Sequence, residues 1–220
     1  QKIITKLWNA GKFSFMHLKD YKLKKIKMGA FDNWILIKLN KIIGSSTKEL
    51  DVYEYSKVKL GVENFFWNIF ADYYLEIIKD RLYNPDKRGK DKKESAQYAL
   101  YISFLTILKL LAPIMPFITE ELYQMFYIKY EKAKSIHLSS WPIVDNKLFD
   151  EGIEKGGDRA ISIISGVRKF KAQHKKSLKQ EINLVLDKKD EELLKPFLDD
   201  LTAVTFAKKI EFGAKFGISF

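Results

Sequence analysis

Residues 55–83 read YSKVKLGVENFFWNIFADYYLEIIKDRLY, and this stretch predicts one long central helix. A first apolar stripe recurs at steps of three and four residues and contains Val58, Val62, Phe65, Phe66, Ile69, Phe70, Tyr73 and Ile77. A second apolar stripe contains Leu60, Trp67, Ala71, Tyr74, Ile78 and Leu82. Two such stripes on one helix indicate burial against neighbours on two sides. The remaining edge is polar and consists of Asn64, Asn68, Asp72, Glu76 and Lys79.

The sequence before this helix predicts two more helices. Residues 2–18 have an apolar face that narrows to Gly11 and Ser14, which lets a neighbouring helix pack closely. A basic loop follows, KDYKLKKIKMGA. Asp32 is the expected N-cap of the second helix, because its side chain can accept a hydrogen bond from a free backbone N–H. We expect Ser45–Ser46 to loosen the end of this helix.

The sequence after the central helix predicts three further helices. Asn84-Pro85 ends the central helix, and a charged linker leads to a helix over residues 95–112. Pro113 and Pro116 then end this helix, and a new helix is expected after them. Glu120 and Glu121 are expected in its first turn, where they complement its dipole. A sixth helix is expected over residues 153–174. Five or six antiparallel helices with short links form a bundle, so the fold class is mainly α.

The last 45 residues have a different pattern. Residues 182–187, INLVLD, alternate as a strand does, DEELLKPFLDDL predicts a short helix, and KKIEFG and FGISF predict two more strands. We therefore expect a helical-bundle domain over residues 1–175 and a small α+β subdomain over residues 176–220.

Composition narrows the possible functions. The formal net charge of +11 and the pI near 9.4 favour a polyanionic partner, either nucleic acid or an anionic membrane surface. The absence of cysteine excludes disulfides, iron–sulfur clusters and thiolate zinc sites. The three histidines are far apart, so we expect no metal site. The apolar run 98–118 is interrupted by two prolines and contains Lys109, which favours a buried bundle helix over a membrane span. The opening carries helical periodicity and no Met, so we expect a piece of a longer chain rather than a signal peptide.

Three groups of side chains have both an ordinary and a functional interpretation. Lys2, Lys6, Asn9, Phe13 and His17 share a face of the first helix, with Lys12 beside it. This face is either a solvated surface or an RNA contact in which Phe13 is an exposed platform for a base. The polar edge of the central helix is either a solvated edge or a reader of base edges. The third group is a basic cluster that either stabilises a helix C-terminus or contacts a phosphate backbone, and it consists of Arg168, Lys169, Lys171, Lys175, Lys176 and Lys179.

The motifs also resemble a known family. KLWNAGKF (6–13), DNWILIKLN (32–40), FFWNIFADYYLEIIKDRLY (65–83), LLAPIMPFITEEL (110–122) and SIHLSSWP (135–142) are similar, in order and spacing, to the region downstream of the catalytic domain in valyl-tRNA synthetases. This resemblance covers residues 6–175, and the part from VRKFKAQHKKSLKQEINLVLD onward resembles the archaeal-type ending. Phosphate-loop, HIGH-like and KMSKS-like motifs are missing from the 220 residues, and no catalytic triad or paired carboxylates stand out.

The resemblance implies a cytoplasmic class I ligase that attaches valine to tRNA(Val) with ATP and Mg, of which this chain supplies a non-catalytic anticodon-binding part without a cofactor. Its partners are then tRNA(Val) and an upstream catalytic domain of the same chain, and no membrane. Carried over by motif, the anticodon-binding residues are Asn9, Lys12, Phe13, Leu75, Glu76 and Lys79. We also expect six basic residues to follow the tRNA backbone, although no family motif identifies them, namely Lys6, Lys24, Lys25, Arg168, Lys171 and Lys175.

Two other functions remain open at this point. The chain could be the same domain of an isoleucyl- or leucyl-tRNA synthetase, or it could be a helical protein-interaction scaffold whose lysines only keep it soluble.

Overall fold

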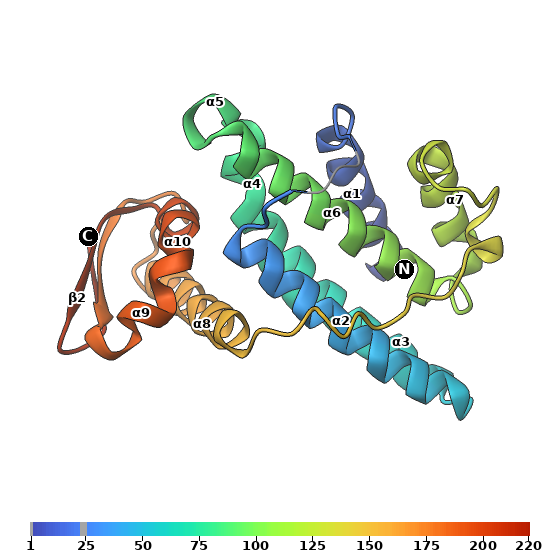
Figure 1. The fold of residues 1–220 in the computed structure, drawn as a ribbon. Helices are drawn as coiled ribbons and strands as arrows, with labels where there is room; N and C mark the ends of the chain where they lie inside the picture. Colours follow the sequence, from blue (N-terminus) through green and yellow to red (C-terminus); the bar gives the residue numbers. More distant parts are fainter. Residues whose placement is uncertain (1, 23–25) are drawn as a thin grey trace.

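The computed structural model describes residues 2–22 and 26–220 of the chain. It is mainly α-helical, as predicted: helices α1 to α7 form a bundle on one side, α9 and α10 lie with a small sheet on the other, and α8 lies between them (Figure 1). The bundle elements are α1 (Lys2–His17), α2 (Ala30–Asp51), α3 (Tyr55–Phe65), η1 (Phe66–Tyr74), α4 (Leu75–Tyr83), α5 (Pro85–Arg88), α6 (Lys90–Leu111), α7 (Pro116–Phe126), η2 (Tyr127–Lys129) and η3 (Ile136–Leu138). The remaining elements are α8 (Glu151–Gln173), β1 (Ile182–Asp187), η4 (Lys188–Asp190), α9 (Glu191–Leu194), η5 (Lys195–Phe197), α10 (Leu198–Thr205), β2 (Ala207–Gly213) and β3 (Gly217–Ser219).

The predicted central helix is present over residues 55–83, but its middle third, η1, is a π-helix. Aromatic side chains recur there at every fourth position, at Phe66, Phe70 and Tyr74. A π-helix has wider turns than an α-helix because its backbone bonds join residues five apart. The wider turn keeps all three rings on one buried row, and it also aligns the polar residues Asn68 and Asp72 along the outer edge.

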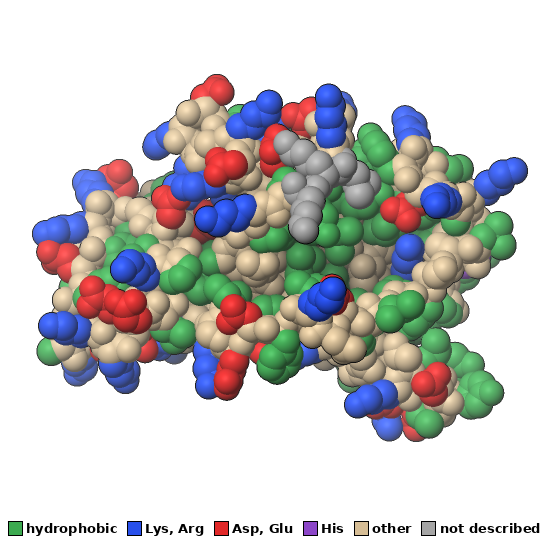
Figure 2. Space-filling view, viewed as in Figure 1, with side chains coloured by type: hydrophobic (Ala, Val, Ile, Leu, Met, Phe, Trp, Pro, Cys, Tyr) green, Lys and Arg blue, Asp and Glu red, His purple; other side chains and the backbone are tan. Residues whose placement is uncertain are grey.

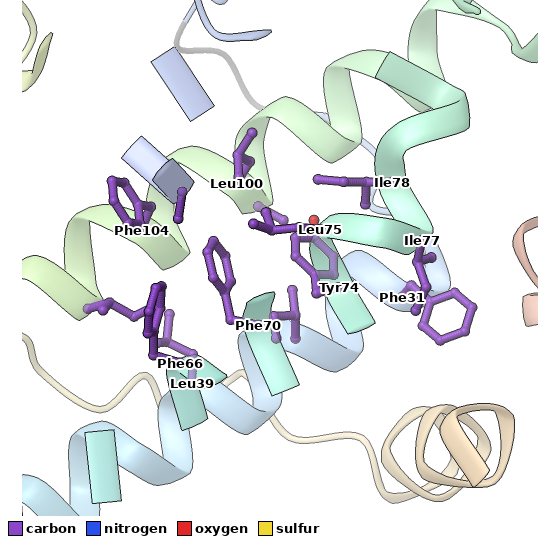
Figure 3. Packing of buried hydrophobic residues seen from close by; sticks show 14 of the residues in the cluster. Phe31, Leu39, Phe66, Phe70, Tyr74, Leu75, Ile77, Ile78, Leu100 and Phe104 are labelled. Carbon is purple, nitrogen blue, oxygen red and sulfur yellow. The ribbon is translucent and has the colours of Figure 1, made fainter. Parts of the chain in front are cut away.

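The aromatic row of η1 forms the middle of the core. The rings of Phe66 and Phe70 stack with their centroids 6.1 Å apart, and Phe70 stacks on Phe104 of α6 at the same distance. Leu39 of α2 lies beside this row, and the row is in contact with both helices (Figure 3). Burial on two sides is therefore confirmed, except that Leu60 of the second stripe is exposed.

The predicted N-cap of α2 is wrong. The helix begins at Ala30 after Gly29, and Asp32 lies inside the first turn with no exposed surface. Its carboxylate accepts hydrogen bonds from Nη1 and Nη2 of Arg81 at 2.7 and 2.9 Å, from the Tyr74 hydroxyl at 2.7 Å, and from the Ser95 hydroxyl. A partner 49 residues away in sequence therefore takes the carboxylate that a cap would use.

Three smaller expectations about helix ends also fail. Helix α7 begins at Pro116, so Glu120 and Glu121 lie beyond its first turn. Glu120 instead accepts hydrogen bonds from the hydroxyl of Ser135 at 2.9 Å and from the backbone N–H of Ile136 at 3.0 Å, which fastens η3 to α7. Helix α2 continues through Ser45–Ser46 to Asp51, and the expected linker before residue 95 forms α5 and the first turns of α6.

The close approach expected at Gly11 is confirmed. A Cβ atom at Gly11 would lie 2.6 Å from Cδ2 of Leu122 in α7 and 3.5 Å from the ring of Phe104 in α6. Ser14, one turn later, is also buried, and its hydroxyl donates to the carbonyl of Ala10. Helix α1 therefore lies against both α6 and α7 through its small residues.

The C-terminal strands are where the sequence predicts them. They form one sheet in the order β2-β1-β3, in which β1 is parallel to β2 and antiparallel to β3. Helices α9 and α10 form the connection between β1 and β2. Alternate residues of β1 are buried, namely Ile182, Leu184 and Leu186.

Helix α8 joins the two sides of the molecule. It packs on α2 in the bundle and on α9 and α10 beyond it. The contact with α2 is close, because a Cβ atom at Gly157 would lie 2.1 Å from the Trp34 ring. The preceding segment crosses the bundle along α2 (Figure 1), where the Trp141 indole N–H donates to the Thr47 hydroxyl at 2.9 Å.

Candidate nucleic-acid interface

Helices α1 and α4 present one joint surface, which is held at two points. At one end Lys6 Nζ lies 2.7 Å from Oδ1 of Asp72, which belongs to η1 just before α4, and at the other the rings of His17 and Tyr83 meet edge to face with centroids 4.6 Å apart. The two contacts are eleven residues apart in both segments of the chain, which is about 16 Å along the axis of α1. We call the residues between them, Asn9, Lys12 and Phe13 of α1 with Glu76 and Lys79 of α4, the α1–α4 surface.

Phe13 is half-buried, whereas we had expected a fully exposed ring on which a base could stack. Its ring centroid lies 4.6 Å from that of His17, which in turn meets Tyr83. His17 itself is buried and does not belong to the exposed face on which the sequence placed it. Burial lowers the pKa of His17, and the neighbouring Lys93 lowers it further, while Asp20 opposes the shift. The imidazole of His17 is therefore neutral at pH 7, and it packs against the ring of Phe13.

The cations of the surface differ in how far they are already paired. Lys12 is exposed, and its Nζ lies 5.4 Å from the centroid of the Trp8 ring. Lys6, one of the expected backbone contacts, is paired with Asp72 and lies 3.7 Å over the Trp67 ring. Lys79 Nζ lies 2.5 Å from Glu76 Oε1 on the same helix. Lys12 therefore has the least compensated charge on the α1–α4 surface.

Leu75 does not lie on this surface. Its side chain is only 7 % exposed and points into the core beside Tyr74 and Leu100 (Figure 3). The expectation that Leu75 touches an anticodon base is thus corrected, because its position on α4 faces α6 rather than solvent. Its place on the outer edge is taken by Tyr83, which is exposed, contacts His17, and follows Glu76 and Lys79 at helical spacing.

The basic cluster of α8 is divided by burial. Lys171 is 1 % exposed, and its Nζ donates to the carbonyls of Leu178 and Thr205, both at 2.8 Å. Burial lowers the pKa of Lys171. The expected backbone contact at Lys171 is therefore wrong: this lysine holds the chain after α8 against the end of α10. Lys175 is exposed, and Lys24 and Lys25 lie outside the residues that the structure describes.

Arg168 lies next to the α1–α4 surface. Its guanidinium donates to the carbonyl of Asp72 at 2.9 Å and lies 4.8 Å over the ring of Tyr73. It also lines a groove of about 960 Å³ between α4, α8 and α10, to which Glu76 and Lys79 contribute one wall. Arg168 thus connects the predicted basic cluster with the predicted anticodon-binding residues.

Charges of both signs are mixed over the face seen in Figure 2, and hydrophobic side chains gather at the tip where α2 ends and α3 begins. Within residues 2–22 and 26–220, no group of three His, Asp or Glu side chains is placed to hold a metal ion. Among the same residues, none of the helices is both long and apolar enough to cross a membrane.

Comparison with known proteins shows the family to which the chain belongs. A family model described as the anticodon-binding domain of tRNA ligase matches residues 32–186. The chain is similar to the valine–tRNA ligase of Wolbachia pipientis wMel, with 36 % identity over 219 residues, which are 96 % of this chain and 24 % of that protein. It is also similar to the valine–tRNA ligases of Pyrococcus furiosus (38 % over 176 residues, 79 % of this chain and 19 % of that protein) and Ehrlichia ruminantium (37 % over 214 residues, 96 % and 26 %).

The chain thus spans about a quarter or less of the length of these relatives. Helix α1 precedes the segment that the family model matches, but the Wolbachia alignment leaves out only 4 % of the chain and so includes at least part of α1. The Pyrococcus alignment is shorter, and the archaeal character of the ending stays a prediction.

Proposed function

Because the chain belongs to the anticodon-binding domain family of tRNA ligases, we propose that its α1–α4 surface binds the anticodon loop of tRNA(Val). The observation that carries this proposal is the pair of contacts, Lys6 with Asp72 and His17 with Tyr83, that brackets Asn9, Phe13 and the α4 edge on one surface. The residues come from two sequence motifs that are far apart along the chain, and these two contacts support placing them on one surface.

The chemistry of this surface suits single-stranded RNA. Unpaired bases stack on aromatic rings, and Phe13 and Tyr83 offer two such rings within one row. Lys12 and Lys79 supply positive charge for phosphates. Asn9 and Glu76 supply donors and acceptors for base edges, which lysine alone does not. Affinity is then mostly electrostatic, and the base contacts supply discrimination.

The specificity for valine and the activity of the longer protein are part of the same proposal. The relatives that cover most of this chain are named valine–tRNA ligase, which favours valine over isoleucine or leucine. An upstream catalytic domain of the longer protein would bind ATP and Mg and attach valine to the tRNA in the cytoplasm. Membership in the family also disfavours a protein-interaction scaffold.

We further propose a boundary near residue 175 between the helical bundle and the α+β part. Helix α8 ends at Gln173, and Lys175 then takes a left-handed backbone with φ of 54°. The boundary is a change of architecture rather than a flexible link, because α8 packs on α2 before it and on α10 after it.

The test is binding of the 220-residue chain to tRNA(Val) and to the same tRNA with a substituted anticodon, over a salt series. Phe13→Leu keeps an apolar side chain in place but removes the π face, and it should abolish the preference for the native anticodon. Lys12→Ala should weaken the binding of both RNAs. It should also reduce the slope of log K against log salt concentration by roughly 0.7–0.9 per lost phosphate contact.

Two controls match these variants. Phe117 is an exposed ring on α7, so Phe117→Leu should leave the anticodon preference intact. Lys147 is an exposed lysine in the segment before α8, so Lys147→Ala removes the same charge away from the surface. If the wild-type chain binds both RNAs equally and Phe13→Leu has no effect, the α1–α4 surface is not an anticodon site.

A further inference from the structure

The groove between α4, α8 and α10 is a direct continuation of the α1–α4 surface. Glu76 and Lys79 belong to both, and Arg168 and Lys179 also line the groove. The floor includes the apolar side chains of Ile77, Ile164 and Val167. Its volume of about 960 Å³ is at the upper end of the range of roughly 300–1,000 Å³ that small-molecule sites occupy, so it is large enough for one nucleotide.

The charges around the groove favour an anion. Six basic and three acidic side chains line it. Among the residues that the structure describes, four of the basic ones have no ion-pair partner, namely Lys87, Arg168, Lys171 and Lys179. Arg168 donates to a backbone carbonyl rather than to a carboxylate, so its charge is not neutralised by that contact. Arg88, in contrast, is paired with Asp80, Asp199 and Asp200.

Phe206 supplies an aromatic ring to this groove in an unusual backbone conformation. It ends α10 with φ of 57° and ψ of 40°, in the left-handed region where a bulky side chain is strained and glycine is usual. Its ring lines the groove and is 40 % exposed. Such strain persists only where the surroundings enforce it, and it gathers at functional sites.

Lys171 is the residue that fixes this arrangement. Its Nζ lies 5.5 Å from the centroid of the Phe206 ring and donates to the carbonyls of Thr205, next to Phe206, and Leu178, next to Lys179. One buried ammonium group thereby holds an aromatic ring and an unpaired lysine on the same groove.

We propose that this groove takes one unstacked nucleotide of the anticodon loop, with its base on Phe206 and its phosphate between Arg168 and Lys179. The inference rests on the proposed function, because the nucleotide reaches the groove from the α1–α4 surface through Glu76 and Lys79. A ring beside unpaired cations is the arrangement that proteins use for single-stranded nucleic acid. An acidic peptide would use the cations but would not require the ring.

The experiment uses the anticodon stem-loop of tRNA(Val) with 5-iodouridine at each loop position in turn, because this base forms a photochemical crosslink to an aromatic ring that it touches. We expect one position to crosslink to Phe206 of the 220-residue chain. Phe206→Gly suits the left-handed backbone and removes the ring, so it should abolish this crosslink and weaken binding roughly 5- to 150-fold. Phe206→Tyr keeps a ring and should restore both.

A second variant tests the charge. Lys179→Ala should reduce the slope of log K against log salt concentration for stem-loop binding by about 0.7–0.9. Lys195→Ala is the matched control, because Lys195 is an exposed lysine of the same C-terminal part and does not line the groove. The Lys195→Ala variant should still form the crosslink to Phe206.

The outcomes separate this inference from the proposed function. If Phe13→Leu abolishes anticodon preference while Phe206→Gly and Lys179→Ala leave stem-loop binding unchanged, the groove is not an RNA site. The inference is then overturned, and the proposed function of the α1–α4 surface stands. If Lys179→Ala weakens binding but Phe206→Gly does not and no crosslink forms, the groove is an electrostatic contact without a base, which also overturns it. If the wild-type chain shows no anticodon preference and no crosslink, both proposals fail.

Discussion

Replacing Arg81 by methionine is the substitution whose effect on stability follows most directly from the structure. Arg81 is 2 % exposed and Asp32 is 0 % exposed. The guanidinium donates two hydrogen bonds to Asp32, at 2.7 and 2.9 Å, and its Nε lies 3.3 Å from Asp200. Arg81→Met keeps an apolar side chain of similar length but leaves the Asp32 carboxylate buried without a counter-charge.

The expected loss in the free energy of unfolding is about 3–5 kcal/mol, which is typical when one partner of a buried ion pair is removed. Arg159 is the matched control, because it also contacts two carboxylates, those of Asp187 and Asp190, at 3.1 and 2.7 Å, but is 32 % exposed. Arg159→Met should cost only about 0.2–1 kcal/mol, because solvent screens a pair that is open to water.

The assay is urea unfolding of the 220-residue chain followed by circular dichroism at pH 7. The double variant Asp32→Asn with Arg81→Met should recover much of the loss, since it removes the unpaired charge and leaves an acceptor for Tyr74 and Ser95. If Arg81→Met and Arg159→Met lose equal stability, or if the double variant is less stable than Arg81→Met, the reasoning from burial is refuted.

The pH dependence of this loss has a definite sign. Arg81 and the hydrogen bonds to the carboxylate lower the pKa of Asp32 against the opposing effect of burial. The wild-type contribution is therefore present above the unfolded pKa of about 3.9 and is lost as pH falls through the folded pKa. Without Arg81, burial raises the pKa of Asp32 instead, and protonation relieves the unpaired charge. The stability difference between wild type and Arg81→Met should thus narrow as pH falls from 7 toward 4.

Three further predictions concern other parts of the fold. Gly157→Ala places a Cβ atom 2.1 Å from the Trp34 ring and should cost about 1–3 kcal/mol or more in urea unfolding, whereas Gly61→Ala, with no atom within 4 Å, should stabilise the chain by about 0.4–1 kcal/mol. Lys171→Gln should lower the midpoint of urea unfolding, because the shorter side chain loses the hydrogen bonds of the buried ammonium group to the carbonyls of Leu178 and Thr205; an unchanged midpoint would show that these bonds do not fasten the chain after α8 to α10. The melting temperature should fall as pH drops below about 6.5, because burial lowers the folded pKa of His17 and the unfolded state then binds more protons; His17→Gln should reduce this dependence.

The helices and strands were predictable because their signals are local. The two stripes of residues 55–83 and the alternation of residues 182–187 depend only on spacing along the chain. The close approach at Gly11 was predictable for the same reason, since a small residue on an apolar face indicates a near neighbour. The π-helix was not predicted, because the four-residue spacing of Phe66, Phe70 and Tyr74 is also that of one face of an ordinary α-helix.

The errors concern residues whose surroundings are set by distant parts of the chain. Asp32 has the right type and position for an N-cap, but Arg81 and Ser95 bury it. Lys171 belongs by sequence to a run of exposed lysines, and only the return of the chain after α10 covers it. Helical spacing alone did not separate Leu75, which faces α6, from the exposed edge of α4.

The position of the candidate site follows from the same buried charges. Along α4, Glu76, Lys79 and Tyr83 face outward, while Arg81 between them points inward and contacts Asp32 of α2 and Asp200 of α10. The hydrogen bond from Ser95 of α6 to Asp32 ties a third helix to the same pair. Because three helices fix the inward side of α4, its outward residues have a constant position relative to both the bundle and α10. The α1–α4 surface and the groove beside it are therefore two sides of one rigid helix, and an RNA loop that reaches from one to the other would meet both in a preformed geometry.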